Sequence, residues 1–417
     1  MERISCGIDF GTSNSSVAVA IDRNITLVPL EESNVTIPSA LFFSPQQAPV
    51  FGRKATQFFF ERREGRFMRS LKRVLGNPVM KQGTMVNNKH VKFEKIIAAF
   101  LKHLHTTTNE FTKHEVMNVV MGRPVHFVDN DAAADTIAQE ELRSIAHAVG
   151  FKNVEFQLEP IAAAFAHERK ITKEQLAIVV DLGGGTSDFT IIKVSQDYMD
   201  KPDRTSDILA STGVRIGGND FDKNLCLSII MPELGYKSTY GKKHLEVPLT
   251  YYHDMAEWSK VNFLYTPKVR SRVQQYYNES HDQRRYGRLL KILDQEKGHS
   301  VLAATEESKI ALTTTSTTET DMSFVEPDFF ITAERDVFES AIAGDMQKIL
   351  AAANECLTQA SIHAADIQLV ILTGGSTEIP RVKQAFQKLF PLARIADENK
   401  LSSVGIGLAY DSERRFR

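Results

Sequence analysis

The sequence predicts an α/β fold made of two similar lobes. Three observations carry this prediction: a strand–Asp–glycine turn–strand motif that occurs twice, a similar order of helices and strands after each copy, and a length of 417 residues, which exceeds what one hydrophobic core usually holds. We expect the lobes to flank a cleft, with lobe I over 1–172 and lobe II over 173–402.

The first copy of the motif lies at 8–14 and reads Ile-Asp-Phe-Gly-Thr-Ser-Asn, and the second lies at 180–188 and reads Val-Asp-Leu-Gly-Gly-Gly-Thr-Ser-Asp. Each copy combines an apolar strand, an aspartate and a glycine turn, and a second apolar strand follows. Asp9 and Asp181 therefore take the same place in the two copies.

Each copy continues in a similar order. After the first copy, apolar residues at helical spacing predict a helix over 93–104, then a strand near 116–121 and a helix that ends before Gly150. After the second copy, a helix over 338–357 precedes a strand at 368–373.

The end of the second half continues with Gly374-Gly375 and a helix that begins at Pro380. Between the motif and this end, the stretch 223–305 is predicted to be a helical insertion in lobe II. The last helix, within 403–417, is expected to pack back on lobe I.

Composition excludes several classes of protein. Hydrophobic residues make up 42% and charged residues 24%, as in ordinary globular proteins, and no apolar run approaches the roughly 20 residues of a membrane helix. A net charge of −2 argues against a dedicated nucleic-acid binder. The 3 cysteines form no CxxC pair, so we expect a cytoplasmic protein without disulfides, zinc or a membrane partner.

The two glycine turns predict a phosphate site. Glycine lets backbone N–H groups converge on an anion without a Cβ in the way, and an aspartate at the strand tip can hold Mg²⁺, usually through water. One such turn is commonly just a hairpin, whereas two facing copies can clamp a polyphosphate. The triple glycine is neither a dinucleotide fingerprint nor a Walker A loop, because a strand follows it and no Gly-Lys-Ser/Thr does.

These motifs resemble the ATPase part of the DnaK-type heat-shock chaperones, which belong to the actin and sugar-kinase superfamily. The blocks that carry the resemblance are Gly7–Asn14, Leu71–Gly76, Glu159–Ala164, Asp181–Asp188 and Leu372–Thr377, with weaker matches at 216–222 and 306–312. They follow the family order over nearly the whole chain. The resemblance implies a duplicated actin-like (ribonuclease-H-like) ATPase fold with a nucleotide cleft. The sequence looks closest to the short bacterial DnaK-like proteins of the YegD type, which lack a standard peptide-binding domain.

The resemblance also implies roles for the turn residues. Asp9 and Asp181 would hold a hydrated Mg²⁺, with Asp188 in the same network, although each aspartate alone could simply cap a turn. The residues expected to bind the phosphates of ATP are Gly11, Thr12, Ser13, Asn14, Gly183, Gly184, Gly185 and Thr186.

The same resemblance assigns hydrolysis to Lys72, Glu159, Asp181 and Thr186. Lys72 would contact the γ-phosphate and the attacking water, and Glu159 and the Thr186 hydroxyl would position that water. Without the resemblance, Lys72 reads as a solvated surface lysine and Glu159 as a helix-dipole partner.

The base and ribose are expected between two groups of residues in the second half. These residues are Gly217, Gly218, Glu306, Lys309, Thr313, Gly374, Gly375 and Ser376. Glu306 and Lys309 could instead pair with each other on a helix surface. Two departures lie here: Glu378 stands where many relatives carry an arginine against adenine, and Leu401 takes the place of an aspartate. Phosphate chemistry is therefore better supported than adenine specificity.

We therefore expect a slow Mg²⁺-dependent ATPase whose lobes close around ATP and signal to a protein client or co-chaperone. Few residues follow Ser403, so we expect no peptide-binding domain of the standard type. Two alternatives stay open, a nucleotide-binding scaffold that hydrolyses little and a small-molecule kinase of the same superfamily. The basic and tyrosine-rich segment 268–297 could contact RNA or a partner, but a helical face with exposed charges is favoured.

Overall fold

The computed structural model describes residues 4–416, apart from 46, 62, 88, 129–130, 169–170, 202, 259 and 397–401. The chain forms two compact units, the first built from Met1–Gly213, Ala352–Thr377 and Phe386–Arg417 and the second from Val214–Ala351 and Glu378–Ala385. The first unit contains segments of both predicted lobes, so the division into lobes after residue 172 stays a prediction.

The first sheet of the first unit has the strand order β11-β10-β1-β2-β3, and β4 adds to β2. Strand β1 pairs antiparallel with β2 and parallel with β10, which pairs parallel with β11. Strand β2 is buried along most of its length, as expected for a strand that is covered on both faces. The bounds are β1 (Ile4–Phe10), β2 (Asn14–Ile21), β3 (Asn24–Leu27), β4 (Thr36–Pro38), β10 (Asn118–Arg123) and β11 (Asn153–Leu158).

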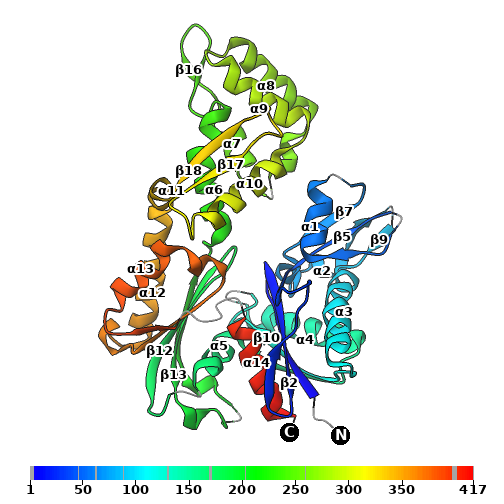
Figure 1. The fold of residues 1–417 in the computed structure, drawn as a ribbon, viewed down its shortest axis with the longest axis vertical. Coiled ribbons are helices and arrows are strands. Elements are labelled where there is room, and N and C mark those ends of the chain that lie inside the picture. Colours follow the sequence, from blue (N-terminus) through cyan, green and yellow to red (C-terminus); the bar gives the residue numbers. More distant parts are fainter. Residues whose placement is uncertain are drawn as a thin grey trace. The chain divides into compact units, whose positions relative to one another are not determined.

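The second sheet repeats this arrangement with the order β14-β13-β12-β19-β20. Strand β12 pairs antiparallel with β13 and parallel with β19, which pairs parallel with β20. In each sheet, two parallel strands continue the sheet beside the first strand of an antiparallel hairpin. This arrangement occurs twice, which confirms the predicted duplication of the α/β fold (Figure 1). The bounds are β12 (Gln175–Leu182), β13 (Ser187–Val194), β14 (Ile208–Val214), β19 (Leu369–Thr373) and β20 (Arg394–Ala396).

Two pairs of helices cover these sheets. Helices α3 and α4 pack together over the first sheet, and α5 and α14 pack together against strands of both sheets. The predicted helices after the first motif and at the end of the chain are therefore present. The bounds are α3 (Phe93–Thr112), α4 (Ala132–Val149), α5 (Glu159–Glu168) and α14 (Ser403–Arg415).

Small elements lie between β4 and α3 in the first unit. Phe42 and Phe58 belong to a small apolar cluster there, whereas Leu41, Met68 and Met80 join the main core under the first sheet. Strand β5 pairs with both β6 and β7. The bounds are β5 (Ala40–Phe43), β6 (Val50–Phe51), α1 (Gly52–Phe60), β7 (Arg66–Arg69), η1 (Leu71–Val74), α2 (Val79–Gln82), β8 (Thr84–Val86) and β9 (Lys89–Val91), where η marks a 3₁₀ turn.

The second unit is mainly helical, as predicted for 223–305, but it also contains the hairpin β15–β16, which the sequence did not predict because strands of two residues leave no hydrophobic period. Strands β17 and β18 form a second small sheet. The bounds are α6 (Gly218–Ile229), η4 (Met231–Leu234), β15 (Thr239–Tyr240), β16 (Leu245–Glu246), α7 (Thr250–Met255), η5 (Val261–Leu264), α8 (Pro267–Glu279), α9 (Gln283–Asp294), α10 (Gly298–Ala311), β17 (Thr317–Asp321), β18 (Phe330–Glu334) and α11 (Arg335–Ala341).

The single helix predicted over 338–357 is wrong in one respect. Helix α11 ends at Ala341 and α12 (Ala343–Ala360) begins after Ile342, whose side chain is fully buried and whose ψ of 0° departs from the helical value. The apolar pattern is thus continuous in sequence, but the helix is interrupted at Ile342. Strand β19 and α13 (Pro380–Leu389) follow as predicted, with Pro380 at the start of α13, and the turn η7 (Gly375–Glu378) lies between them.

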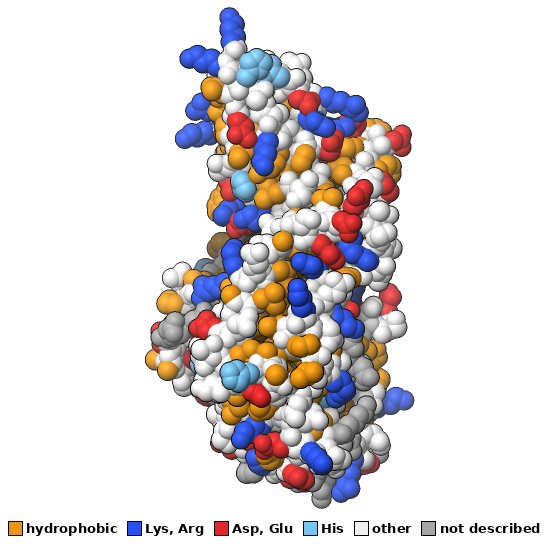
Figure 2. All heavy atoms as spheres, turned by 90° about the vertical axis from the view of Figure 1, so that its left-hand side faces the viewer, with side chains coloured by type: hydrophobic (Ala, Val, Ile, Leu, Met, Phe, Trp, Pro, Cys, Tyr) orange, Lys and Arg blue, Asp and Glu red, His pale blue; other side chains and the backbone are white. Residues whose placement is uncertain are grey.

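The arginines of α9 are paired with carboxylates, and so is Arg270 of α8. Arg288 binds Glu233 and Glu326, Arg285 binds Glu233, and Arg270 binds Asp294. On the face of the molecule that Figure 2 shows, positive and negative side chains lie interspersed. This pairing favours the interpretation of 268–297 as a charged helical face.

Among the described residues, no helix combines the length and the apolar character that crossing a bilayer requires.

Two glycines allow α14 to approach its neighbours closely. A Cβ on Gly407 would lie 1.7 Å from the carbonyl oxygen of Ala162 in α5, and one on Gly7 would lie 2.3 Å from the backbone nitrogen of Ala409. Because the obstructing atoms belong to the backbone, a side chain at either position would force the helices or the sheet apart.

We predict that Gly407→Ala destabilises the protein by about 1–3 kcal/mol or more, because the added methyl group overpacks the α5–α14 contact. The matched control is Gly344→Ala near the start of α12, where no atom lies within 4 Å of the added Cβ. The control should be neutral or slightly stabilising, since alanine is the better helix former. Thermal unfolding of both variants checks the prediction, and equal melting temperatures would contradict it.

Candidate functional site

Four charged side chains converge in the first unit. Asp9 is the penultimate residue of β1 and Asp181 the penultimate residue of β12, so the duplicated hairpins present them equivalently. Glu159 is the first residue of α5, and Lys72 lies in the 3₁₀ turn η1. The sequence separates these four residues widely, and the fold brings them within electrostatic reach of one another.

Lys72 and Glu159 form an ion pair. The ammonium group of Lys72 donates a hydrogen bond to Glu159 Oε1 over 2.5 Å, and the two side chains are only 10% and 15% exposed. Lys72 is therefore not a solvated surface lysine. Glu159 also lies where the N-terminal dipole of α5 favours a negative charge, so that the dipole interpretation and the ion pair hold together.

The turn that carries Lys72 begins with an unusual backbone conformation. Ser70 precedes η1 with φ of 58° and ψ of 35°, a left-handed conformation that costs free energy in residues other than glycine. The next residue, Leu71, is buried and fixes the turn in the core. Lys72 thus reaches Glu159 from a short, anchored segment.

The aspartates have strongly raised pKa values. Burial, with the charges of Glu159 and Asp181, raises the pKa of Asp9 to about 8, and Lys72 opposes this only in part. Burial and Glu159 likewise raise the pKa of Asp181 to about 6, against a hydrogen bond from Thr373. Three crowded carboxylates gain free energy from a nearby cation, and carboxylate oxygens suit Mg²⁺, so these residues fit the metal role that the resemblance implies.

The surroundings favour the charged form of Lys72, whereas they disfavour the charged forms of the two aspartates. Burial alone would lower the pKa of Lys72, but the carboxylates of Glu159 and Asp9 outweigh this cost and raise it. The lysine is therefore a permanent positive charge at neutral pH, suited to neutralise an anion and unsuited to take up a proton.

The first glycine turn is held by hydroxyl groups. Ser39 Oγ donates to the carbonyl oxygen of Gly11 over 2.7 Å and lies 2.9 Å from Ser15 Oγ. A Cβ on Gly11 would lie 2.1 Å from the carbonyl oxygen of Asn14, so the turn requires glycine there. The predicted residues Thr12 and Ser13 are half-buried and Asn14 is exposed, which leaves their polar groups accessible to a ligand.

The second glycine turn closes through the backbone N–H of Gly183, which donates to the carbonyl oxygen of Thr186 over 2.9 Å. Gly183, Gly184 and Gly185 are half-buried, whereas Thr186 is exposed. Asp188 is also exposed, and its carboxylate lies beside Gly213, where a Cβ would come within 2.6 Å of Oδ1.

The segment after β19 packs against this second turn. Ser376 Oγ donates to the carbonyl oxygen of Gly183 over 3.3 Å. Gly374 has φ of +82°, and a Cβ there would lie 2.3 Å from the carbonyl oxygen of Leu182 and 2.8 Å from Asp181 Oδ1. The predicted residues Gly374 and Ser376 therefore adjoin the predicted phosphate turn.

The remaining predicted residues belong to the second unit. Gly217 precedes α6 and Gly218 begins it, and Lys309 of α10 binds Asp222 Oδ2 over 2.8 Å and the carbonyl oxygen of Gly218 over 3.4 Å. The alternative in which Lys309 pairs with Glu306 is therefore wrong. Asp222 lies 87 residues away in sequence, but the fold brings its carboxylate within hydrogen-bonding distance of Lys309.

Glu306 is half-buried, and Thr313 donates to the carbonyl oxygen of Ile310 over 2.7 Å. Glu378 is exposed at the end of η7. Leu401 lies outside the described residues. The assembly of these residues with Gly374, Gly375 and Ser376 into a base and ribose site stays a prediction.

Sequence reasoning missed three residues that contact the predicted site. Thr373 donates to Asp181, Ser39 supports the first turn, and Arg73 lies against Gly185. Thr373 and Arg73 are members of the matching blocks and could have been suspected from their neighbours. Ser39 has no such signal, since it is distant in sequence from both turns.

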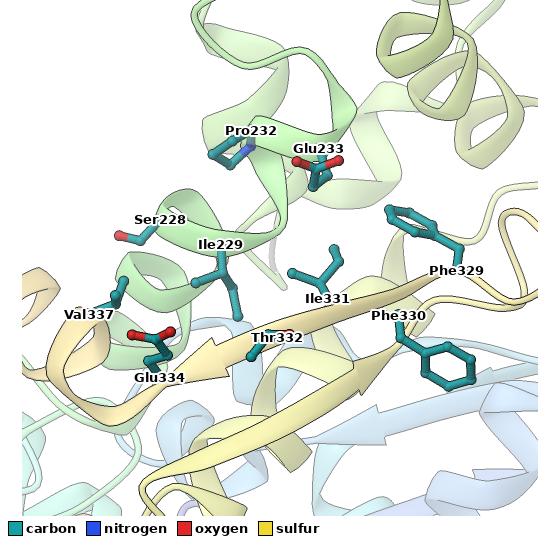
Figure 3. A pocket seen from close by; sticks show the side chains of 10 residues that line it. All are labelled: Ser228, Ile229, Pro232, Glu233, Phe329, Phe330, Ile331, Thr332, Glu334 and Val337. Carbon is teal, nitrogen blue, oxygen red and sulfur yellow. The ribbon is translucent and has the colours of Figure 1, made fainter.

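A pocket of about 470 Å³ lies in the second unit, between the end of α6, η4 and strand β18. Ile229 and Ile331 point toward each other across it (Figure 3). None of the residues that line it belongs to the predicted site, so the turns and carboxylates of the first unit remain the candidate site.

The raised pKa of Asp9 predicts how stability depends on pH. Between 3.8 and about 8 the folded protein binds more protons at this group than the unfolded chain does, so Asp9 lowers the free energy of unfolding as pH rises. Asp9→Asn should therefore stabilise the nucleotide-free and metal-free protein, and the gain should increase as pH rises through this window.

Thermal unfolding over this pH range measures the effect. The control is Asp22→Asn in the exposed turn after β2, where asparagine tolerates the φ of 47° as well as aspartate does. The control should have the same melting temperature as the wild type at each pH. A stabilisation by Asp9→Asn that stays constant with pH would contradict the prediction.

Comparison with known proteins adds an independent finding. Residues 5–242 and 268–412 match the family model described as Hsp70 protein. Within the predicted insertion at 223–305, the match thus omits only 243–267 at its centre, which contains β16 and the segment up to α8.

Curated relatives align along nearly the whole chain. The chaperone protein HscA homolog of Histophilus somni is 24% identical over 98% of this chain and 58% of its own length. The chaperone protein DnaK of Thermosipho africanus is 27% identical over 97% of this chain and 58% of its own, and that of Trichormus variabilis is 26% identical over 97% and 53%. The chain thus spans little more than half the length of these relatives.

The duplicated sheets, the paired aspartates at equivalent strand ends and the match over most of the sequence lead to one conclusion: this protein belongs to the Hsp70 family.

Proposed function

We propose that this protein binds ATP with Mg²⁺ and hydrolyses it slowly, and that the hydrolysis controls a protein partner. The observation that carries the proposal is the buried Lys72–Glu159 ion pair beside Asp9 and Asp181 in the first unit. Membership of the Hsp70 family and the relatives named as chaperone proteins support it.

Asp9 and Asp181 are the residues proposed to hold the metal, with Asp188 contributing at the edge. When bound, Mg²⁺ neutralises charge on the phosphate oxygens. The raised pKa values of both aspartates support this role, because the protein places carboxylates together at a cost that a cation would remove.

The glycine turns are proposed to bind the phosphates through backbone N–H groups. The relevant segments are 11–14 and 183–186, which are half-buried or exposed and free of bulky side chains at the glycines. The base and ribose would contact Gly217, Gly218, Glu306, Lys309, Thr313, Gly374, Gly375 and Ser376, as the resemblance implies.

Lys72 and Glu159 are proposed to act together in hydrolysis. The fixed positive charge of Lys72 would stabilise charge on the γ-phosphate, and the carboxylate of Glu159 would orient the attacking water, with the exposed hydroxyl of Thr186 nearby. Their mutual hydrogen bond holds both side chains in place without substrate, so that little reorganisation is needed on binding.

The proposed output is a change in how the protein engages a client or co-chaperone, at the level that the chaperone relatives suggest. Cytoplasmic location and a likeness to the YegD-type proteins stay predictions. The scaffold that binds nucleotide without hydrolysis, and the small-molecule kinase, are outcomes that the following test separates.

We predict that Lys72→Ala lowers the single-turnover rate of Mg-ATP hydrolysis by about 100-fold or more while nucleotide binding persists, because a preorganised charge at the reacting phosphate is lost. The control is Lys81→Ala, which removes the same charge from an exposed position in α2. The control should hydrolyse ATP at the wild-type rate.

The wild-type protein decides between the alternatives in the same assay. Tight binding without hydrolysis would favour the scaffold, and hydrolysis that depends on an added sugar or acid would favour the kinase. Absence of nucleotide binding would overturn the proposed function.

A further inference from the structure

A second positive charge lies at the second glycine turn. Arg73 follows Lys72 in η1, and its guanidinium nitrogen Nη2 lies 1.8 Å from the position that a Cβ on Gly185 would occupy, with Cζ at 3.1 Å. The guanidinium group therefore fills the space that the missing side chain of Gly185 leaves.

The backbone conformation does not by itself require glycine at 185. Gly185 is not among the residues with positive φ, so other amino acids could adopt its backbone geometry. Its neighbour Gly183 meets only Thr186 within 4 Å of an added Cβ, at 3.5 Å or more. At Gly185, by contrast, an added Cβ would overlap the guanidinium group of Arg73, which would then have to move away from the turn.

Arg73 differs from other arginines of the first unit. Arg53, Arg123 and Arg204 each form an ion pair with a carboxylate. Among the residues that the structure describes, no hydrogen bond or ion pair is made by the Arg73 side chain, which is exposed. The protein thus directs an uncompensated guanidinium, with its five N–H donors, to a turn proposed to bind phosphate.

The segment fixes the direction of both basic side chains. Leu71 is buried, and Lys72 and Arg73 follow it in a 3₁₀ turn, where successive side chains point in different directions. Lys72 points inward to Glu159, and Arg73 points to Gly185. The two cations therefore have separate tasks, since Lys72 already has a carboxylate partner.

We propose that Arg73 is a second cationic ligand of the terminal phosphate of a bound nucleoside triphosphate, and this inference rests on the proposed function. The planar guanidinium fork matches two phosphate oxygens at once, which an ammonium group cannot do. Because Arg73 approaches the turn from the same segment as Lys72, its contact is with the γ-phosphate and is lost in the diphosphate.

The test uses isothermal titration of the full chain with Mg²⁺ and either ADP or an ATP analogue whose β–γ bridge resists hydrolysis. Arg73→Ala should weaken binding of the triphosphate by about 10- to 100-fold and of ADP by much less, as expected for loss of a charged hydrogen bond. Arg73→Lys should keep the charge but lose the fork, and should recover only part of the affinity. Since no described residue forms a hydrogen bond or ion pair with the Arg73 side chain, the variants should melt at the wild-type temperature.

The control is Arg66→Ala, which removes one positive charge from an exposed position on β7 of the same unit. Its affinities should equal those of the wild type. If the wild type binds neither nucleotide, the proposed function fails. If the wild type binds and Arg73→Ala binds both nucleotides with wild-type affinity, the inference on Arg73 is overturned and the proposed function stands. The same holds if Arg66→Ala weakens binding of the triphosphate as much as Arg73→Ala does.

Discussion

The buried ion pairs at the two ends of helix α5 are the interactions on which the candidate site depends. At its start, Glu159 binds Lys72, and at its end, Glu168 accepts two hydrogen bonds from Arg204, at 2.7 and 2.9 Å. The side chains of Glu168 and Arg204 are fully buried. A carboxylate at the C-terminal end of a helix opposes the helix dipole, so Arg204 is needed to compensate both the dipole and the burial.

This arrangement explains how one helix connects the site to the core. Helix α5 packs with α14 and with strands of both sheets, and its close approach to α14 is possible because residue 407 is glycine. The position of Glu159 is therefore fixed by apolar packing along the whole helix and by charges at both ends. A carboxylate held this firmly can orient a water molecule, which a carboxylate on a mobile loop does poorly.

The charges at the candidate site differ from the simple ion pairs that occur elsewhere in both units. In the second unit, the arginines of α9 are paired with Glu233 and Glu326, and Lys309 is paired with Asp222. In the first unit, three carboxylates share the charge of Lys72, and Arg73 lies at the glycine turn that follows Asp181, with no carboxylate partner among the described residues. Several carboxylates that share one cation, beside an arginine at a glycine turn, are the pattern expected where a ligand carries both a metal ion and phosphates.

The sequence by itself determined the fold class, the duplication and the turns. Periodic apolar residues and glycine positions are local signals, and for this reason the strands around Asp9 and Asp181, the helix from Phe93 and the proline start of α13 could be predicted. The hairpin β15–β16 and the break at Ile342 could not, because neither a two-residue strand nor a one-residue interruption of a helix changes the apolar period of the sequence.

Only the tertiary structure decided the partners of the charged residues. The sequence placed Lys309 three residues from Glu306, yet its partner is Asp222, and it gave no reason to join Ser39 to Gly11 or Arg73 to Gly185. Electrostatic and hydrogen-bonding partners depend on distances in space between segments that are far apart in the chain, which local sequence patterns do not contain. The sequence therefore determined which residues carry charge. The fold decided which of those charges are paired, buried or accessible to a ligand.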